Sequence, residues 1–378
     1  MGQQLCCQAS TPQRFSRVTL TIRDEAKLRA DLEQWNAILD RDGRFRHIRR
    51  VVVLGTMDTS APSEGVGTSV GSGWRDSDSE SDTEDEEDAY KVSFNPAKPV
   101  LSPQYKQAQN EAWLPFVHFL SKLPALTDLV YACTNPIPAC VLTELHERHP
   151  KSRLHVRTFS LRSLYQEWND LHDVDPDEYA LVTSPCLYSI HTKCLAYDSD
   201  DGRFSFNLEA LRHMVAMGYA PNLRHLRISP AQPPAPDSRR AKLESLVVST
   251  NRNDPSELRA WLARTDFSFL RRFEHYCGLS PACLEILTSL GASGKLNSLR
   301  YLGLDLSMED DDDGNSHDLN DLAVQFFRSL PPLEKLTRRE SAVSNATVPA
   351  SRTCNGVYAA VMAVQKKSLF ITYALLRS

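Results

Sequence analysis

A leucine pattern recurs along this chain and predicts most of its strands. The pattern is Leu-x-x-Leu-x-(Leu/Ile/Val), and its clearest copies begin at Leu223, Leu243 and Leu299. Other copies, some of them partial, begin at Leu126, Leu154, Leu270 and Leu333. From Leu223 onward, the first leucines of neighbouring copies lie 20, 27, 29 and 34 residues apart. These distances span the period of leucine-rich repeats and extend somewhat beyond it.

Strand geometry explains why the leucines need this spacing. Alternate residues of a strand point to opposite faces of a sheet, so the leucines face a core and the intervening residues face solvent. One repeat cannot bury its apolar face alone, and neighbouring repeats therefore stack. The intervening positions predict a concave binding surface, although each residue taken singly is also compatible with ordinary solvated polarity. These positions are Arg224, His225, Arg227, Glu244, Ser245, Val247, Arg300, Gly303 and Asp305.

Helical periodicity separates the leucine strands. Asp24 is placed to cap a helix that runs to about Asp40, between strands at Arg17–Ile22 and His47–Leu54. This strand–helix–strand unit, residues 15–55, corresponds to one repeat. Further helices are expected at Trp113–Leu123, Pro138–His149, Leu208–Met217, Pro255–Ala263, Pro281–Leu290 and Leu319–Leu330.

The alternation of helices and leucine strands predicts the fold class. We expect an α/β protein, an irregular leucine-rich-repeat solenoid of parallel strands and helices, whose main array covers residues 110–336. The long gap between Leu154 and Leu223 leaves room for one degenerate copy, near Leu187–Tyr197. Residues 337–378 form an atypical C-terminal tail, which is either a divergent cap or sequence foreign to the fold.

The apolar rhythm disappears between residues 56 and 109, where we predict a disordered acidic loop. Asp76–Asp88 holds nine acidic residues in thirteen, and such a segment cannot bury enough apolar surface to offset the entropy of ordering. Four hydroxyl residues of this run each have an acidic residue three positions on, which suits an acid-directed kinase. The alternative is a solvated linker of low complexity. The candidate phosphorylation sites are Ser77, Ser79, Ser81 and Thr83.

Residues 1–14 are expected to be a disordered N-terminus with one candidate modification. Gly2 could accept a myristoyl group, and Cys6 and Cys7 could be palmitoylated, which together would anchor the chain to a membrane. Position 6 is Cys where Ser or Thr is expected, and no polybasic stretch follows. An arbitrary start ahead of Phe15 is the alternative.

Composition narrows the class of partner. The chain has 378 residues, 41% of them hydrophobic, and a net charge of -5 that is concentrated in its acidic runs. Nine cysteines, an odd number with irregular spacing and no signal peptide, favour reduced thiols and a cytoplasmic or nuclear location. No stretch resembles a membrane span, and no basic cluster alternates with aromatic residues as nucleic-acid binding would require.

No metal, cofactor or catalytic motif emerges from the sequence. Cys133, Cys140, His146 and His149 are close in sequence, but their spacing matches no zinc site. Glu309–Asn320 resembles a calcium loop only in part, since Asn320 stands where a bidentate Glu is needed. Phosphate-binding glycine loops and nucleophile motifs are missing as well. We therefore expect a protein without a cofactor that is not an enzyme.

Several stretches carry a resemblance to a known family. They are "RFSRVTLTIRDEAKLRADLEQWNAIL" at Arg14–Leu39, "FRHIRRVVVLG" at Phe45–Gly55, "LPALTDLVYACTNPIP" at Leu123–Pro138, "HPKSRLHVRTFSLRSL" at His149–Leu164 and "YAPNLRHLRISP" at Tyr219–Pro230. Over roughly residues 14–336 the chain resembles the leucine-rich-repeat region of filamentous-fungal F-box proteins. The shared motifs are mostly core leucines and turn prolines.

The resemblance implies a protein-interaction function. In that family the repeats present a protein substrate, and an N-terminal F-box docks onto the adaptor of a cullin-type ubiquitin ligase. This chain departs from the pattern, because only 14 residues precede the first strand and no Leu-Pro-x-Glu-like start is present. Two hypotheses follow: a substrate-recognition region whose F-box is lost or truncated, or a leucine-rich-repeat scaffold protein unconnected with ubiquitination.

Overall fold

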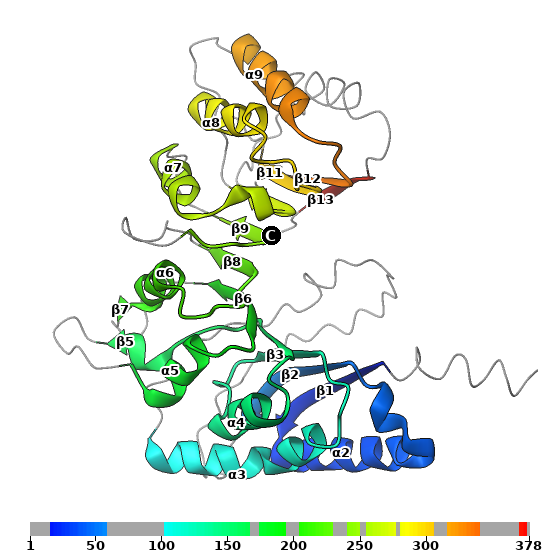
Figure 1. Cartoon of the computed structure of the whole chain (residues 1–378). Helices are drawn as coiled ribbons and strands as arrows, with labels where there is room; N and C mark the ends of the chain where they lie inside the picture. Colours follow the sequence, from blue (N-terminus) through cyan, green and yellow to red (C-terminus); the bar gives the residue numbers. More distant parts are fainter. Residues whose placement is uncertain are drawn as a thin grey trace, which may run out of the picture. The chain divides into compact units, whose positions relative to one another are not determined.

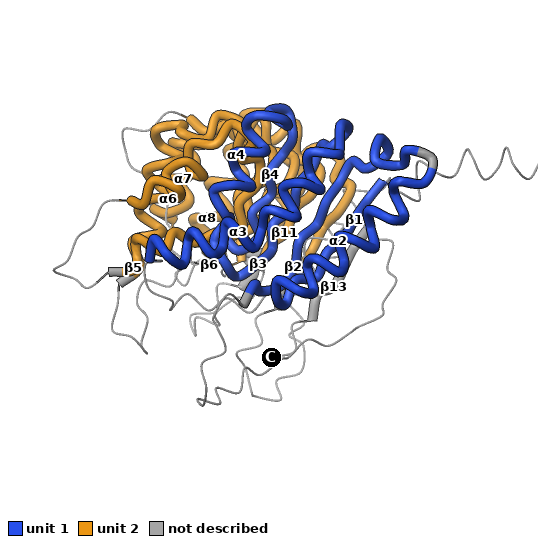
Figure 2. Tube along the Cα trace, turned by 90° about the horizontal axis from the view of Figure 1, so that it is seen from below, with its two compact units in different colours: residues 1–158 blue, residues 159–378 orange. Residues whose placement is uncertain are grey.

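The structure is a computed structural model with two units, residues 1–158 and 159–378 (Figure 2). It describes residues 16–58, 102–166, 174–193, 204–229, 240–249, 255–276, 280–305, 316–340 and 370–375. Within these residues, none of the helices combines the length and the apolar character that crossing a membrane would require.

The first unit is a parallel sheet with its helices packed side by side (Figure 1). Its strands follow the order β1-β2-β3-β4, and each pairs in parallel with the next. Helix α2 packs against α3, and α3 packs against α4. The elements are β1 (Arg17–Asp24), α2 (Glu25–Leu39), a 3₁₀ helix η1 (Arg41–His47), β2 (Arg50–Asp58), α3 (Pro103–Leu120), β3 (Asp128–Cys133), α4 (Ala139–Arg148) and β4 (Arg153–Val156).

The second unit repeats this arrangement. Its main sheet has the order β6-β8-β9-β10-β11-β12-β13 and is parallel throughout. The short strands β5 and β7 pair antiparallel with each other. The elements are η2 (Arg162–Leu164), β5 (Tyr165–Gln166), α5 (Pro176–Val182), β6 (Leu187–Lys193), β7 (Phe204–Ser205), α6 (Asn207–Met217), β8 (His225–Ser229), β9 (Ser245–Val248), α7 (Pro255–Arg264), η3 (Phe267–Phe269), β10 (Arg272–His275), α8 (Pro281–Ala292), β11 (Tyr301–Asp305), α9 (Ser316–Ser329), β12 (Lys335–Glu340) and β13 (Phe370–Leu375).

The strand order identifies a solenoid-like α/β fold. In each unit the main-sheet strands lie side by side in the order in which the chain makes them, as stacked repeats require. In a doubly wound sheet the strand order reverses at a switch point, and no reversal occurs in either described sheet. The expected fold class, an α/β solenoid of parallel strands and helices, is confirmed.

A repeated bulge explains why the motif spaces its first two leucines by three residues instead of two. At the start of β2, β3, β9, β10, β11 and β12, one carbonyl of the preceding repeat accepts hydrogen bonds from two successive amides. Arg224 O accepts from the amides of Glu244 and Ser245 at 2.8 and 3.1 Å, and Arg271 O accepts from those of Arg300 and Tyr301 at 2.8 and 2.9 Å. The extra residue places two consecutive side chains outward before regular alternation begins.

The leucines of the motif form the core, as predicted. The second leucine of a copy lies in register with its counterparts on adjacent strands, and in the copy at Leu270 that counterpart is Phe273. Their burial removes apolar surface from water at about 25 cal/mol per Å². Buried at 9% exposure or less are Leu126, Leu129, Leu223, Leu226, Leu243, Leu246, Leu270, Leu299, Leu302, Leu333 and Leu336.

Most predicted helices occur within one to three residues of their expected bounds. Asp24 caps α2 as predicted, since its carboxylate accepts a hydrogen bond from the amide of Lys27 at 2.7 Å. The degenerate copy expected near Leu187 exists as β6. The strand expected from His47 starts later, at Arg50, because residues 41–47 form η1.

Two boundaries were placed wrongly. The acidic loop was expected to reach residue 109, but α3 already begins at Pro103, with the Ser102 hydroxyl accepting from the amide of Tyr105 at 3.2 Å. The first turns of α3 are polar and hide its start, yet Gln109 is buried and donates to Pro136 O at 2.9 Å. In the C-terminal tail, β12 continues to Glu340, and Phe370–Leu375 adds the parallel strand β13.

Candidate binding surface

Five of the nine predicted outward residues of the second unit are partly exposed, whereas Ser245, Val247 and Gly303 are buried. Arg224, His225 and Arg227 are partly exposed at β8, while Leu226 and Ile228 between and after them are buried. Arg300 is partly exposed at the start of β11, with its Nε 3.7 Å from Glu334 Oε1. Register places His225 beside Ser245 and Arg227 beside Val247 on one face of the sheet. This face is the candidate binding surface of the second unit.

Strand β9 departs from the prediction. Glu244 is partly exposed, but Ser245 is only 5% exposed and Val247 only 3%. Ser245 lies in register between His225 and Arg272, whose longer side chains flank its small one. The expectation that Ser245 is exposed for contact is therefore wrong. The side chain of Asp305, the last residue of β11, lies outside the described residues, and so does its predicted role.

An acidic network occupies the same outward face. Glu274 on β10 accepts from Arg272 Nε through one carboxylate oxygen, and its other oxygen bonds to the hydroxyl of Tyr276. Arg272 begins the same strand two positions before Glu274, and Tyr276 directly follows that strand, two positions after Glu274. Gly303 lies in register beside it, and a Cβ at Gly303 would approach Glu274 Cγ to 2.7 Å. Glycine at this position therefore leaves the space that the Glu274 side chain fills.

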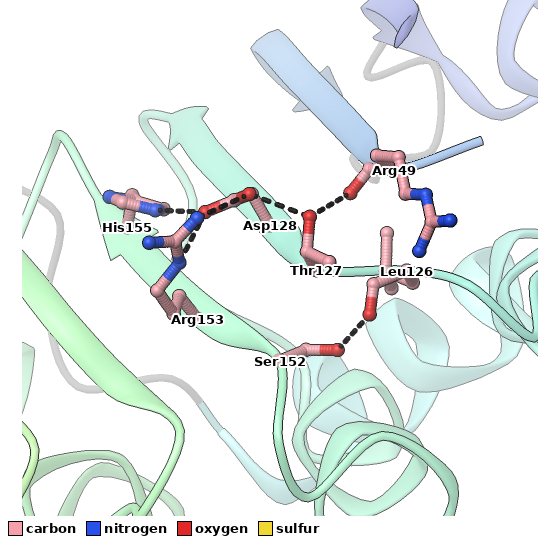
Figure 3. A network of polar contacts seen from close by, with 7 residues as sticks. All are labelled: Arg49, Leu126, Thr127, Asp128, Ser152, Arg153 and His155. Carbon is pink, nitrogen blue, oxygen red and sulfur yellow. Dashed lines mark hydrogen bonds and ion pairs between the residues drawn. The ribbon is translucent and has the colours of Figure 1, made fainter. Parts of the chain in front are cut away.

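The first unit carries a second acidic network, centred on Asp128 (Figure 3). Asp128 Oδ1 accepts from Arg153 Nε at 2.8 Å and from His155 Nε2 at 3.0 Å. Asp128 Oδ2 lies 2.9 Å from Arg153 Nη2 and 2.8 Å from Thr127 Oγ1. Arg153 thus donates to both carboxylate oxygens of Asp128, and this bidentate geometry makes arginine–carboxylate pairs strong. Because Arg153 and His155 belong to β4, the network joins two successive repeats.

This environment fixes the charges of Asp128 and His155. Burial raises the pKa of Asp128, but the hydrogen bonds from His155, Arg153 and Thr127 and the charge of Arg153 outweigh it and hold the pKa well below its usual range. Burial lowers the pKa of His155, and the charges of Arg157 and Arg50 lower it further, against the opposing effect of Asp128. At neutral pH, Asp128 is ionised and a neutral His155 donates to it.

Sequence reasoning missed this cluster, although a signal existed. Applying the outward register of the leucine motif to the copy at Leu126 selects Asp128, and the preceding strand then gives Arg50. The next copy, at Leu154, is hard to recognise because a polar residue, Ser152, precedes it where the motif leads one to expect an apolar one. Ser152 is buried and donates to Leu126 O at 2.7 Å (Figure 3).

The cysteine and histidine residues considered for metal binding have packing roles. Cys133 is buried in β3, and burial raises the pKa of its thiol. Cys140 Sγ lies 3.7 Å from Asn110 O, and burial raises its pKa to about 11. His149 is buried with its Nε2 3.1 Å from Leu120 O. Within the described part of the chain, no three His, Cys, Asp or Glu residues gather as metal ligands.

The predicted modification sites lie outside the described residues. They are Gly2, Cys6 and Cys7 at the N-terminus and Ser77, Ser79, Ser81 and Thr83 in the acidic run.

Comparison with known proteins adds no relative. No protein-family model matches the chain, and a search of curated proteins gave no match either.

Proposed function

We propose that this chain is a protein-interaction module that binds its partner through the outward faces of its parallel sheets. The observation that supports this proposal is the separation of the two faces of β8. Leu226 and Ile228 are buried in the core, whereas His225 and Arg227 stay partly exposed on the opposite face. Stacked repeats align such positions into an extended surface without forming a closed pocket, which suits a protein partner better than a small molecule.

We further propose that this partner is a protein substrate, as in the F-box receptors that the sequence resembles. The chain would then recognise a substrate for ubiquitination, in a complex that includes a cullin-ligase adaptor. The alternative is a leucine-rich-repeat scaffold protein that binds a partner without any link to ubiquitination. Both hypotheses assign binding and no chemistry to the surface.

Charge reversal on the outward face of the sheet, compared with charge reversal on the helices, tests the binding surface. Arg224→Glu with Arg227→Glu changes the outward face, and Arg259→Glu with Arg328→Glu changes exposed positions of α7 and α9. Affinity purification of the tagged full-length chain should lose its specific partner with the first pair and keep it with the second. Equal recovery with both pairs would contradict the proposal.

The same purification separates the two hypotheses. Co-purification of the adaptor and the cullin with the native chain supports substrate recognition for ubiquitin ligation. A specific partner recovered repeatedly without adaptor or cullin would leave the scaffold protein as the function.

A further inference from the structure

The sheet of the first unit has an open edge at β1. Among the described strands, β1 pairs with β2 alone and stands first in the strand order (Figure 1). Its register with β2 runs without a break from Arg17 to Ile22. A strand at the edge of a sheet presents a row of backbone N–H and C=O groups that the sheet itself does not use.

The register shows which backbone groups of β1 face the open edge. The N–H and C=O of one strand residue point to the same side of the strand, and successive residues alternate between the two sides. Ser16 O accepts from two successive amides of the next repeat at 2.8 and 3.0 Å, so Ser16 faces β2. Thr19 and Thr21 lie an odd number of positions further on, and their backbone groups therefore face the open edge.

This edge is accessible, as a comparison of register partners shows. Thr19 and Val52 are partners on the same face of the sheet, but Thr19 is exposed, whereas Val52, with a strand on each side, is 0% exposed. Thr21 is exposed as well, and its partner Leu54 is only partly exposed. The two threonines are exposed because β1 has no neighbour on their side.

β1 also lacks most of the features that protect an edge strand from pairing. Protected edges are short, contain Pro or Lys, or turn a charged side chain inward. β1 has eight residues without Pro or Lys, and its inward side chains Val18, Leu20 and Ile22 are all apolar. Its one register shift with β2 falls at its end, between Ile22 and Asp24. The edge is therefore competent to pair with another strand.

We propose that β1 binds an extended segment of a partner protein, which adds to its open edge as a further strand. Backbone hydrogen bonds to Thr19 and Thr21 supply the affinity, as strand addition requires. β-Branched residues in the segment suit the two exposed threonines, since such side chains pair well across strands. Arg23 is exposed at the end of β1 and makes no ion pair within the described part of the chain, so it favours an acidic residue at the end of the segment.

The structure favours a single strand of another protein over two other occupants. Val18, Leu20 and Ile22 are at most 1% exposed, so no open apolar core remains for a further repeat to cover. A second copy of this chain would pair β1 with β1 antiparallel about a two-fold axis. The register that pairs the whole strand would set Arg17 opposite Arg23, and like charges directly opposite each other are destabilising.

Fluorescence anisotropy with the full-length chain tests this inference. The probe is a labelled peptide, Glu-Thr-Val-Thr-Val-Thr-Glu, which has an acidic residue at each end for either strand direction. Two isomers carry two N-methyl groups each, one on its valines and the other on two of its threonines. Because alternate amides of an added strand face β1, one isomer should bind like the parent peptide. The other should bind roughly thirtyfold more weakly, since each lost backbone hydrogen bond changes affinity about fivefold. Equal binding by both isomers, or no binding of the parent peptide, would overturn the inference.

Thr21→Pro is the matching change in the protein. The amide of Thr21 faces the open edge, so proline removes a donor from the added strand and none from the pairing with β2. Affinity should fall about fivefold, whereas Thr21→Val keeps the amide and should change affinity by less than about twofold. If Thr21→Pro unfolds the chain, the two peptide isomers still distinguish strand addition from side-chain docking. Unchanged affinity in a folded Thr21→Pro chain would contradict the inference.

Two further measurements separate this inference from its alternatives. A native dimer that Thr21→Pro dissociates in size-exclusion chromatography would assign the edge to a second copy and overturn the inference. Arg224→Glu with Arg227→Glu changes the other unit and should leave peptide binding unchanged, because the inference goes beyond the proposed function and uses an edge of the sheet instead of its outward face. A chain that loses its co-purified partner through this pair but never binds the peptide would contradict this inference alone.

Discussion

Among the side chains that the structure describes, each unit has one buried acidic residue on the outward face of its sheet, and the two are held in different ways. Asp128 in the first unit is bound by Arg153 and His155 from the adjacent strand β4, as well as by its neighbour Thr127. Glu274 in the second unit is bound by Arg272 of its own strand and by Tyr276, the residue directly after that strand. The Asp128 network therefore ties two repeats together, whereas the Glu274 network orients side chains within one repeat.

This difference shows how a repeat protein can build a polar surface by two routes. A network across strands depends on register, so it stabilises the stacking of repeats and fixes the charges of groups from both. A network along one strand depends only on residues two positions apart and on space beside it, which Gly303 provides. Removing the first should therefore loosen neighbouring repeats, while removing the second should have a local effect.

The largest effect is expected from Asp128→Ala. It removes a carboxylate that is only 12% exposed and leaves Arg153, His155 and Thr127 without their shared acceptor, at a cost on the order of 3 kcal/mol. Urea denaturation measures this loss of stability. Hydrogen exchange of the native state should be faster in both β3 and β4. Asp31→Ala breaks the solvent-exposed pair with Lys27 and should cost about 0.5 kcal/mol. A comparable loss in both variants would contradict the cross-strand role.

The pH dependence of the same site sharpens the comparison. The pKa of Asp128 is lowered from its ordinary value of 3.8, so its stabilisation is present above that pH and is lost as pH falls toward the folded value. The stability difference between the native chain and Asp128→Asn should accordingly narrow below about pH 4. A difference that stays constant from pH 7 to pH 3 would show that the charge of Asp128 contributes nothing.

A smaller effect is expected from Gly303→Val, which places a side chain in the space occupied by Glu274. Overpacking of this kind costs about 2 kcal/mol. The cost should shrink when Glu274→Ala is added, because the obstructing side chain is then gone, and a double-mutant cycle by urea denaturation measures this coupling. If the losses in unfolding free energy of the two substitutions simply add, Gly303 is required for its backbone conformation and not for the space that it leaves to the Glu274 side chain.

The smallest effect is expected from Glu274→Gln. The amide keeps the shape of the side chain but loses the charged hydrogen bond with Arg272, at a cost of about 1 kcal/mol. Hydrogen exchange should change in β10 and leave β8 unaffected. Faster exchange spreading to β8 and β11 would place Glu274 in the same class as Asp128.

The leucine motif made the architecture predictable because its information is local. The burial of Leu226 and Ile228 can be predicted from the alternation within one strand, and the start of α2 can be predicted from the capping side chain of Asp24. The start of α3 at Pro103 was missed because its first turns are polar and hold their place through the buried Gln109. The Asp128 network was missed because its partners are 25 and 27 residues away, and only the register of β3 and β4 brings them together.

Site-specific photo-crosslinking tests the central claim that the outward faces bind the partner. A photoreactive residue replaces Arg227 on the outward face of β8 in one variant and the exposed Arg259 of α7 in the other. Both positions are in the second unit, and both replace an arginine, so charge and fold change alike. The account predicts a strong crosslink to the co-purified partner from position 227 and none from position 259. A crosslink from position 259 without one from position 227 would contradict it.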